Sequence, residues 1–430
     1  MSKKKVLIIT YYWPPSGGAG VQRWVKFCKY LPQLGFEPIV LTVKNGTYPL
    51  IDKTLLEQVP ENLEIHRSKI IEPYSIFGAL TGKGKLEVSE PATAFSTKNE
   101  GLIKKLGVWI RANFFIPDAR RLWVPFAFIK AKEIIKTHQI DTVITTAPPN
   151  STHLIGTRLK KAMPQLKWIM DMRDPWSKIF FNETIPRSTF SDRVDVKYEK
   201  EALQLADEVI VVSESMAKLQ QTVFSRNYLV LPNGFDHEDF PKIQEAKTGE
   251  NFVIKYVGSM TESAIPRTFF SALQSLKVNG LKNFELQFFG SINNTVKDIL
   301  ETSDINDNVT FHGYVPHQRA KKEMQTADLL LLVIPKTRNN ELILTGKLFD
   351  YIAAEKPIFC IGPIPGDASD IIKKYELGYS FCYDQEQDIH DALKQMMTGS
   401  EVPYKKWKYS FSDHPFSRLS LTKQLVKIIQ

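Results

Sequence analysis

The sequence predicts an α/β protein with two doubly wound, Rossmann-like domains that face each other across a cleft. Short apolar runs alternate with helical patterns along most of the chain, which indicates parallel strands joined by crossover helices. This alternation is interrupted once, near residue 240, and then resumes. The 430 residues also exceed the roughly 250 to 300 residues that one hydrophobic core usually holds.

The first series of elements predicts an N-terminal domain over residues 1–240. Its expected strands are 6–9, 38–42, 142–146, 168–172, 209–212 and 228–231, and its expected helices are 21–34, 151–161 and 194–205. The polar stretch 81–99 predicts a loop. Asn233 and Gly234 break the pattern, so we expect a hinge at residues 232–234.

The second series predicts a C-terminal domain over residues 241–412. Its expected strands are 252–257, 285–289, 309–312, 329–333 and 358–361, and its expected helices are 267–277, 346–354 and 368–374. Ligands of doubly wound sheets collect at the carboxyl ends of the strands, so two such domains are expected to hold a ligand between them.

Composition and charge narrow the class of partner. Hydrophobic residues make up 43% and charged residues 24%, as in an ordinary globular protein. The net charge of +9 favours an anionic partner, which is a nucleotide or an anionic lipid surface. Nucleic acid is not expected, because no zinc-ligand spacing, helix-turn-helix pattern or aromatic RNA-binding motif accompanies the charge.

The cysteines and the apolar runs point to a cytoplasmic protein. Only three cysteines occur, widely separated, which indicates a reducing compartment rather than a disulfide framework. The strongest later apolar run, residues 329–334, is far shorter than the roughly 20 residues that span a bilayer.

A glycine-rich loop containing Gly17 and Gly18 follows the first predicted strand. It is not a dinucleotide-binding fingerprint, because Arg23 stands where the third glycine would be required. Hydride transfer is therefore disfavoured. We expect this loop to line a ligand cleft, and a tight turn without a ligand is the alternative.

The clearest candidate site is the helix start at Thr345, Gly346 and Lys347. Free backbone N–H groups and the positive end of the helix dipole would suit a diphosphate there, and Lys347 would add a full positive charge. Asp350 lies on the same helical face and could accept hydrogen bonds from ribose hydroxyls. The alternative is that these polar side chains are merely solvated.

Two polar side chains follow predicted strands of the first domain. His153 lies in the first turn of a helix, where it is either a sugar contact or a structural residue. Asp174 belongs to a mixed-charge segment, Asp171 to Trp176, and is either a partner for acceptor hydroxyls or part of an internal ion pair.

Residues 101–136 interleave basic and aromatic side chains, a pattern that suits an anionic membrane surface. A helix pair with a buried aromatic core is the alternative. No metal site is expected, because the histidines are scattered and neither an Asp-x-Asp pair nor a His-Glu-x-x-His motif occurs.

Six segments in order along the chain resemble the retaining glycosyltransferases of family 4, which have the two-Rossmann GT-B fold. They are Tyr11-Tyr12-Trp13-Pro14-Pro15-x-Gly17-Gly18, Thr146-Ala147-Pro148-Pro149 with His153, Asp171-x-Arg173-Asp174-Pro175-Trp176, Pro232-Asn233-Gly234-Phe235-Asp236, Tyr256-Val257-Gly258-Ser259, and Lys347-Leu348-Phe349-Asp350-Tyr351 leading to Lys356-Pro357. The resemblance implies transfer of a sugar from a nucleoside diphosphate to a hydroxyl acceptor, with retention at the anomeric carbon. In this fold the last helix crosses back, which implies that residues 413–430 pack on the N-terminal domain.

The resemblance also assigns roles. Gly258 and Ser259 would lie beside the diphosphate, Gly346 and Lys347 would bind it, and Asp350 would hold the ribose. Tyr314 and Val315 would border the base, and the loop of Gly17 and Gly18 would close over the sugar. Lys347, His153 and Asp174 are the expected catalytic residues, and Thr345 completes the donor site. No cofactor is expected besides the nucleotide-sugar co-substrate, with a UDP-sugar favoured.

The sequence departs from the family pattern at two places. Leu342 stands where the first of the family's paired glutamates is expected, with Glu341 displaced by one position, which leaves the donor sugar open. The loop after Gly258 lacks the family's usual arginine, and Arg267 or Lys347 would have to supply that charge.

Members of this family often extend lipid-linked glycans. The resemblance therefore implies a polyprenyl-linked or surface-glycan acceptor and a peripheral position on the inner face of the cell membrane, with residues 101–136 as the docking face. A sugar-nucleotide 2-epimerase shares the architecture and is the alternative enzyme. A non-catalytic nucleotide-sugar binding protein is the third possibility.

Overall fold

The computed structural model describes residues 3–71, 102–178, 186–240, 251–399, 402–408 and 410–430. The chain divides into two compact units. The first contains Met1–Pro232 together with Leu421–Gln430, and the second contains Asn233–Ser420. Each unit is built around its own parallel sheet. Within the described ranges, no helix is both long enough and apolar enough to span a bilayer.

The first unit contains a seven-stranded parallel sheet with the order β3-β2-β1-β4-β5-β6-β7. Its strands are β1 (Lys4–Ile9), β2 (Phe36–Val43), β3 (Glu64–Ser68), β4 (Thr142–Ala147), β5 (Lys167–Met172), β6 (Glu208–Val211) and β7 (Leu229–Val230). The chain order reverses direction between β1 and β4, which is the arrangement of a doubly wound Rossmann sheet.

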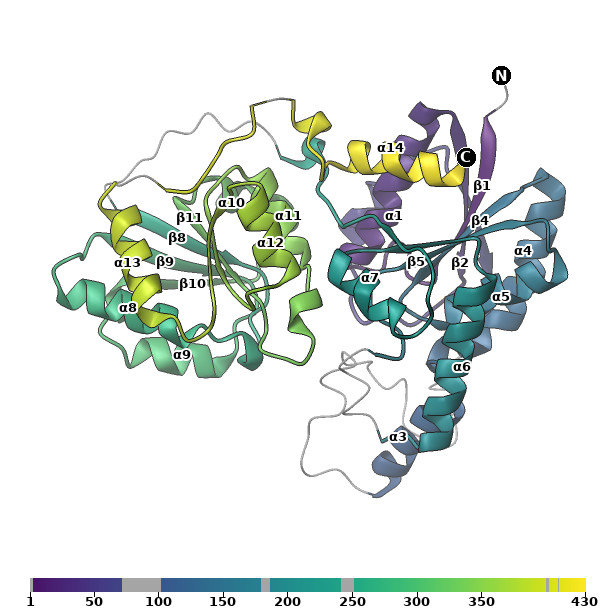
Figure 1. Ribbon diagram of the computed structural model, residues 1–430, viewed down its shortest axis with the longest axis horizontal. Coiled ribbons are helices and arrows are strands. Elements are labelled where there is room, and N and C mark those ends of the chain that lie inside the picture. The colour runs from purple at the N-terminus through teal and green to yellow at the C-terminus, as the bar shows by residue number, and fades with distance from the viewer. Residues whose placement is uncertain (1–2, 72–101, 179–185, 241–250, 400–401, 409) are drawn as a thin grey trace. The chain divides into compact units, whose positions relative to one another are not determined.

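Helices cover both faces of this sheet (Figure 1). They are α1 (Ala19–Tyr30), α3 (Leu102–Phe114), α4 (Val124–His138), α5 (Ser151–Ala162), α6 (Thr189–Leu205), α7 (Glu214–Gln221) and the end of α14 (Arg418–Ile429). Side chains of β1 alternate between the faces: Leu7 and Ile9 pack into the core under α4 and α5, whereas Val6 and Ile8 pack against α1 and α14. Every β1 position from Val6 to Ile9 is therefore apolar.

The last helix is part of the first unit's core. Leu421, Leu425 and Ile429 of α14 pack with Trp24 of α1, and Figure 1 shows the two helices on the same side of the sheet. The Nζ of Lys167, at the start of β5, donates a hydrogen bond of 2.7 Å to the carbonyl oxygen of Ile428. Strand and helix are thus joined by both apolar packing and a polar contact.

The second unit contains a six-stranded parallel sheet with the order β10-β9-β8-β11-β12-β13. Its strands are β8 (Phe252–Val257), β9 (Phe284–Phe289), β10 (Val309–Gly313), β11 (Leu329–Val333), β12 (Ile358–Ile361) and β13 (Gly378–Phe381). Its helices are α8 (Arg267–Val278), α9 (Asn294–Glu301), α10 (His317–Gln325), α11 (Gly346–Ala353), α12 (Asp367–Lys374) and α13 (Glu386–Met397). This order repeats the doubly wound topology of the first unit.

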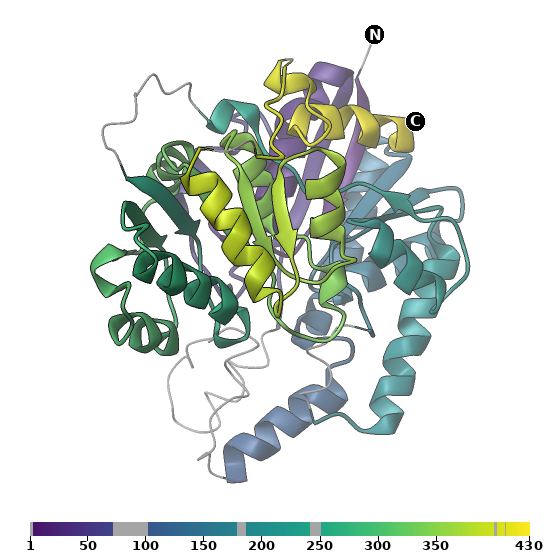
Figure 2. The same ribbon diagram turned by 60° about the vertical axis from the view of Figure 1, so that its left-hand side comes forward.

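The core of the second unit also has two sides, which can be followed in Figures 1 and 2. Leu329 and Leu331 of β11 pack on the side of α8 and α13, while Leu330 and Leu332 pack on the side of α10, α11 and α12. Because both faces of β11 are covered, its sequence is a continuous run of leucines ending in valine.

The predicted fold class, two Rossmann-like α/β domains, is confirmed by both sheets. The unit boundary lies between Pro232 and Asn233, and the chain returns to the first unit at Leu421. The edge strands β3 and β13 were not predicted, and the expected loop 81–99 lies outside the described residues. The cleft between the domains stays a prediction.

Candidate functional site

The best-defined candidate site lies at the carboxyl ends of β8 and β11, where α11 begins. Thr345 is the N-cap residue of α11, with extended backbone angles and no side-chain capping hydrogen bond. Its Oγ1 is buried and has no hydrogen-bond partner in the described part of the chain. A buried hydroxyl without a partner is costly, and it lies at a helix end that also has free N–H groups. Both features suit an anionic ligand.

Lys347 and Gly258 approach each other closely at this helix end. Gly258 follows β8 with a φ of 123°, and a Cβ at this position would lie 2.3 Å from the Cε of Lys347. Only glycine combines this backbone conformation with room for the lysine. The structure therefore brings together Gly258 and Lys347, two residues that are far apart in the sequence.

Polar contacts hold the end of the Lys347 side chain. Its Nζ donates to the Tyr256 hydroxyl and to the carbonyl oxygen of Ser259, the latter at 2.8 Å. The Tyr256 hydroxyl in turn donates to the same Ser259 oxygen at 2.7 Å. The ammonium also lies 4.2 Å from the centroid of the Tyr256 ring, in a cation–π contact. Desolvation lowers the pKa of Lys347 to about 7. An anion that binds beside it would favour the protonated, positively charged form.

Asp350 lies one turn further along α11 and is half-buried. Burial raises the pKa of its carboxyl to about 6, although Lys321 and Arg418 oppose that rise. Within the described residues, no group donates a hydrogen bond to this carboxylate. Its oxygens are therefore available to ligand hydroxyls, as a ribose contact requires.

The remaining residues of the second unit that were predicted near the donor have fewer features that suit a ligand contact. Tyr314 follows β10 and is 86% exposed, whereas the side chain of Val315 is buried in the core beside α11. Only its backbone could border a base. Glu341 and Leu342 lie in a short 3₁₀-helix, Asn340–Leu342, and both are half-buried.

The glycine loop of the first unit is fastened to a neighbouring segment. The N–H of Gly17 donates to the carbonyl oxygen of Leu50 at 2.9 Å, so this amide already has a partner. Gly18 is the N-cap residue of α1 and has a φ of 109°, a conformation that favours glycine. The glycine loop is therefore an ordered turn that leads into α1.

His153 is fully buried in the first turn of α5. Its Nδ1 lies 2.9 Å from the Thr145 hydroxyl, and its ring centroid lies 6.0 Å from that of Trp176. Burial lowers its pKa to about 3, so the imidazole is neutral at physiological pH. Its Nε2 is buried and has no partner among the described residues. These facts favour the structural interpretation over the predicted catalytic one, because a neutral, enclosed imidazole is poorly suited to proton transfer.

The segment Asp171 to Trp176 separates into a structural part and an exposed part. Asp171 is fully buried, and its carboxylate accepts hydrogen bonds from Arg23, Trp24 and Thr146 at 3.1, 2.8 and 2.8 Å. Burial alone would raise the pKa of Asp171, but Arg23 and the other donors hold it below its usual value. Asp174 is exposed and stays a candidate for contact with an acceptor.

The sequence did not predict the interactions that surround Lys347 and Asp350 in the second unit or Asp171 in the first. Lys321 and Arg418 come from distant parts of the chain and follow no motif spacing that relates them to α11. Tyr256 belongs to a segment that resembles the family, but its contact with Lys347 was not predicted. The buried pair of Arg23 and Asp171 was likewise not predicted. Its two residues stand on α1 and β5, and only the folded sheet brings them together.

One group in the first unit also brings together possible metal ligands. The Glu64 carboxylate lies 2.6 Å from Nε2 of His66 and 3.2 Å from Nε2 of His138. The histidines are scattered along the sequence, and the fold brings these two to the same carboxylate. The Nζ of Lys5 lies 3.4 Å from Nδ1 of His138, which places a cation beside the group and disfavours a second one.

The predicted docking face, residues 101–136, is mixed. Trp109, Phe114 and Ile129 are exposed, as membrane contact would need. Arg120 and Trp123 are buried instead, because Arg120 donates to the carbonyl oxygen of Thr47 and Trp123 donates to Ser68. These two residues therefore belong to the core interpretation. Residue 101 and the side chains of residues 102–106 lie outside the description.

Comparison with known protein families gives a match for the second unit. Residues 236–410 match the family model described as glycosyl transferases group 1. This match lies within the second unit and covers less than half of the chain. A search of curated protein sequences found no match.

Solved structures resemble the chain over almost its whole length. A glycosyltransferase from Rickettsia africae has a TM-score of 0.63 at 13% identity, with 100% of this chain and 98% of that chain covered. HepE from Anabaena, in complex with UDP and glucose, has a TM-score of 0.58 at 14% identity, with 99% of each chain covered. A putative UDP-N-acetylglucosamine 2-epimerase from Listeria monocytogenes has a TM-score of 0.56 at 11% identity, with 99% of this chain and 96% of that chain covered. At such identities the likeness establishes the fold, which is the GT-B arrangement of two Rossmann-like units, and leaves the reaction open.

Proposed function

We propose that this protein is a glycosyltransferase that moves a sugar from a nucleoside diphosphate to a hydroxyl acceptor, with retention at the anomeric carbon. The observation that carries the proposal is the start of α11, where Lys347 meets Gly258 and Ser259 beside the Thr345 hydroxyl, which is buried and has no partner among the described residues. The group 1 glycosyltransferase match over residues 236–410 includes this whole arrangement.

Each residue of this arrangement has a task that its chemistry suits. The amides of Gly346 and Lys347 point out of the helix start and would hold the diphosphate, with the Lys347 ammonium neutralising part of its charge. Asp350 would accept hydrogen bonds from the ribose hydroxyls. Tyr256 keeps Lys347 in position before the donor arrives.

The transfer step follows from stabilising the leaving group. The bond between the anomeric carbon and the diphosphate oxygen breaks, and positive charge develops on the sugar ring. The acceptor oxygen then bonds to the same face of the anomeric carbon, and its proton passes to the departing phosphate oxygen. We propose that Lys347 and the helix amides supply the positive charge, without a divalent metal ion or other cofactor, and that UDP is the nucleotide.

For the acceptor we propose a polyprenyl-linked or surface glycan at the cytoplasmic face of a membrane. The exposed Trp109, Phe114 and Ile129, with Arg111 and Lys136 nearby in the sequence, would support peripheral contact with anionic lipid. The exposed Asp174 is the residue of the first unit proposed to contact the acceptor hydroxyl.

The decisive experiment follows the fate of the donor. The protein is incubated with a panel of nucleotide sugars, with and without polyprenyl-linked acceptors, and both nucleotide release and sugar identity are measured. Acceptor-dependent release with a glycosylated product supports transfer. Release of a 2-epimer without an acceptor would establish the epimerase instead, and binding without donor consumption would establish a sensor.

A further inference from the structure

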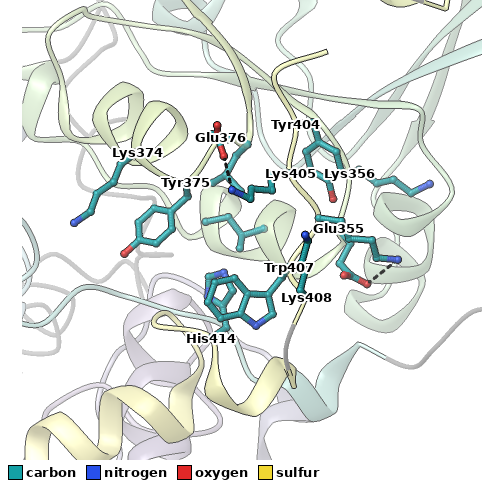
Figure 3. A pocket seen from close by; sticks show the side chains of 13 residues that line it. Glu355, Lys356, Lys374, Tyr375, Glu376, Tyr404, Lys405, Trp407, Lys408 and His414 are labelled. Carbon is teal, nitrogen blue, oxygen red and sulfur yellow. Dashed lines mark ion pairs between the residues drawn. The ribbon is translucent and has the colours of Figure 1, made fainter. Parts of the chain in front are cut away.

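A cavity of about 460 Å³ lies in the second unit (Figure 3). It is lined by Ile352 and Glu355, at the end of α11 opposite to Lys347. Glu355 follows α11 and precedes β12, and Glu376 precedes β13, so this cavity is at the amino ends of the strands. The helix start lies at their carboxyl ends. The eight residues of α11 separate the two places by about 12 Å along the helix axis.

Aromatic side chains form one wall of this cavity. Trp407 and His414 lie together in Figure 3, with their ring centroids 4.5 Å apart. Tyr404 is held in place because it forms an antiparallel bridge with Leu377. Burial lowers the pKa of His414 to about 4, so its ring is a neutral surface at physiological pH. The wall offers flat, uncharged faces.

Cations dominate the rest of the lining. Five lysines and two glutamates contribute, which leaves a formal charge of +3. The lysines are Lys356, Lys374, Lys405, Lys406 and Lys408. All but Lys356 are exposed, so their ammonium groups can reach a ligand at the mouth.

The two glutamates of the cavity both have left-handed backbone conformations. The φ angles of Glu355 and Glu376 are 54° and 52°, at the positions that follow the C-cap residues of α11 and α12, where glycine is usual. Each carboxylate is paired with a lysine: Glu376 with Lys405 at 3.1 Å, and Glu355 with Lys406 at 3.7 Å. Exposed ion pairs contribute too little to offset such backbone strain. The two ion pairs place Lys405 and Lys406 beside these carboxylates at the rim of the cavity.

We propose that this cavity is a second binding site, for a small ligand in which a ring is joined to a phosphate. The ring would stack on Trp407, and the phosphate would be bound by the lysines that the glutamates hold at the mouth. The volume suits a sugar phosphate or a nucleoside monophosphate. This site is distinct from the proposed donor site and does not depend on sugar transfer.

Calorimetric titration tests the proposal with defined probes. Glucose 1-phosphate, uridine 5′-monophosphate, glucose and inorganic phosphate are each titrated into the full chain carrying Lys347→Ala, so that the donor site contributes little. One of the two ring-bearing phosphates is expected to bind at least about tenfold more tightly than glucose or inorganic phosphate, because it uses both the wall and the lysines. The choice between them identifies the ring as a carbohydrate or a nucleoside.

Variants locate the binding. Trp407→Ala and the pair Lys405→Ala with Lys406→Ala should each weaken the tighter probe by about tenfold or more, whereas Trp407→Phe should retain most of the affinity. Lys373→Ala is the control, because Lys373 is an exposed lysine of α12 that does not line the cavity. Thermal unfolding of each variant verifies that it is folded.

Three outcomes would overturn the proposal. The first is that no ring-bearing phosphate binds at millimolar concentration, and the second is that binding is unaffected by the Trp407 and lysine variants. The third is that vesicles of anionic phospholipid bind through these residues while the soluble probes do not, which would make the face a membrane contact instead.

Discussion

The side chain of Lys347 occupies the space that a Cβ on residue 258 would fill, 2.3 Å from the lysine Cε. This contact joins the loop after β8 to the start of α11, and it makes the lysine's position dependent on a glycine that follows the strand.

Gly258→Ala should therefore displace Lys347 and lower donor affinity as well as stability. Gly280→Ala is the matched control, because Gly280 also has a positive φ, 97°, but a Cβ there would meet nothing within 4 Å. Both variants should lose about 1 kcal/mol of unfolding free energy from backbone strain, measured by denaturant titration. Only the Gly258 variant should bind UDP more weakly. Equal UDP affinities in the two variants would contradict the proposed role of the contact.

Lys347→Ala should lower transfer by about 10² or more, because a preorganised cation for the leaving diphosphate is lost. Tyr256→Phe keeps the lysine but removes the hydroxyl to which it donates, so it should have a smaller effect. Turnover of the purified variants at saturating donor provides the measurement. Undiminished turnover in Lys347→Ala would remove the residue from the mechanism.

Binding of UDP above neutral pH should be accompanied by proton uptake. The pKa of Lys347 is lowered to about 7 by desolvation, so at pH 8 its amine is mostly uncharged in the free protein. A bound diphosphate favours the ammonium form and raises this pKa, which draws up to about one proton from solution. Calorimetry in buffers of different ionisation enthalpy measures the uptake, and Lys347→Met should abolish it. A binding enthalpy at pH 8 that is independent of the buffer would count against the idea.

Asp350→Asn should weaken UDP binding while stabilising the protein at neutral pH. The pKa of Asp350 is raised to about 6 in the folded state, above its unfolded value, so the native protein binds the extra proton between about pH 4 and pH 6. Stability of the natural protein therefore falls as pH rises through that window, and the asparagine variant escapes this loss. Unfolding at pH 8 should show a more stable variant, and unfolding near pH 4 should show little difference. A variant that is less stable at pH 8 would refute the assignment.

Glu376→Gly should stabilise the protein by about 0.5 to 1 kcal/mol, because glycine adopts the left-handed conformation after α12 without strain. The same change removes the partner of Lys405, so it should weaken any ligand of the second cavity. Glu376→Gln is the control: it removes the charge and keeps the backbone strain, so it should lose affinity without gaining stability. Thermal unfolding and calorimetry separate the two effects.

Much of the fold could be predicted from the sequence because buried parallel strands consist of continuous runs of apolar residues. The strands β3 and β13 escaped prediction because each lies at the edge of its sheet and is only partly buried, and polar residues such as Glu64, His66 and Ser380 interrupt its apolar pattern. The helix start at Gly346 could also be located, since its signal is local. Gly258 and Ser259 were placed beside it by the family resemblance alone. The contacts of Tyr256 and Lys321 could not be predicted, because only the sheet brings these two residues close to α11. The burial of His153 was equally hidden, because a helix start does not reveal what packs above it.

The packing of Leu421, Leu425 and Ile429 against Trp24 has a consequence for biosynthesis. The second unit is in effect inserted into the chain of the first, so during translation it can complete its core while the first is still missing its final piece. Until α14 has been synthesised, the apolar side chains of α1 that it covers, Trp24 among them, stay exposed to water. Loss of the packing by α14 would therefore disturb the core of the first unit, which is synthesised first, and leave the core of the second unit intact.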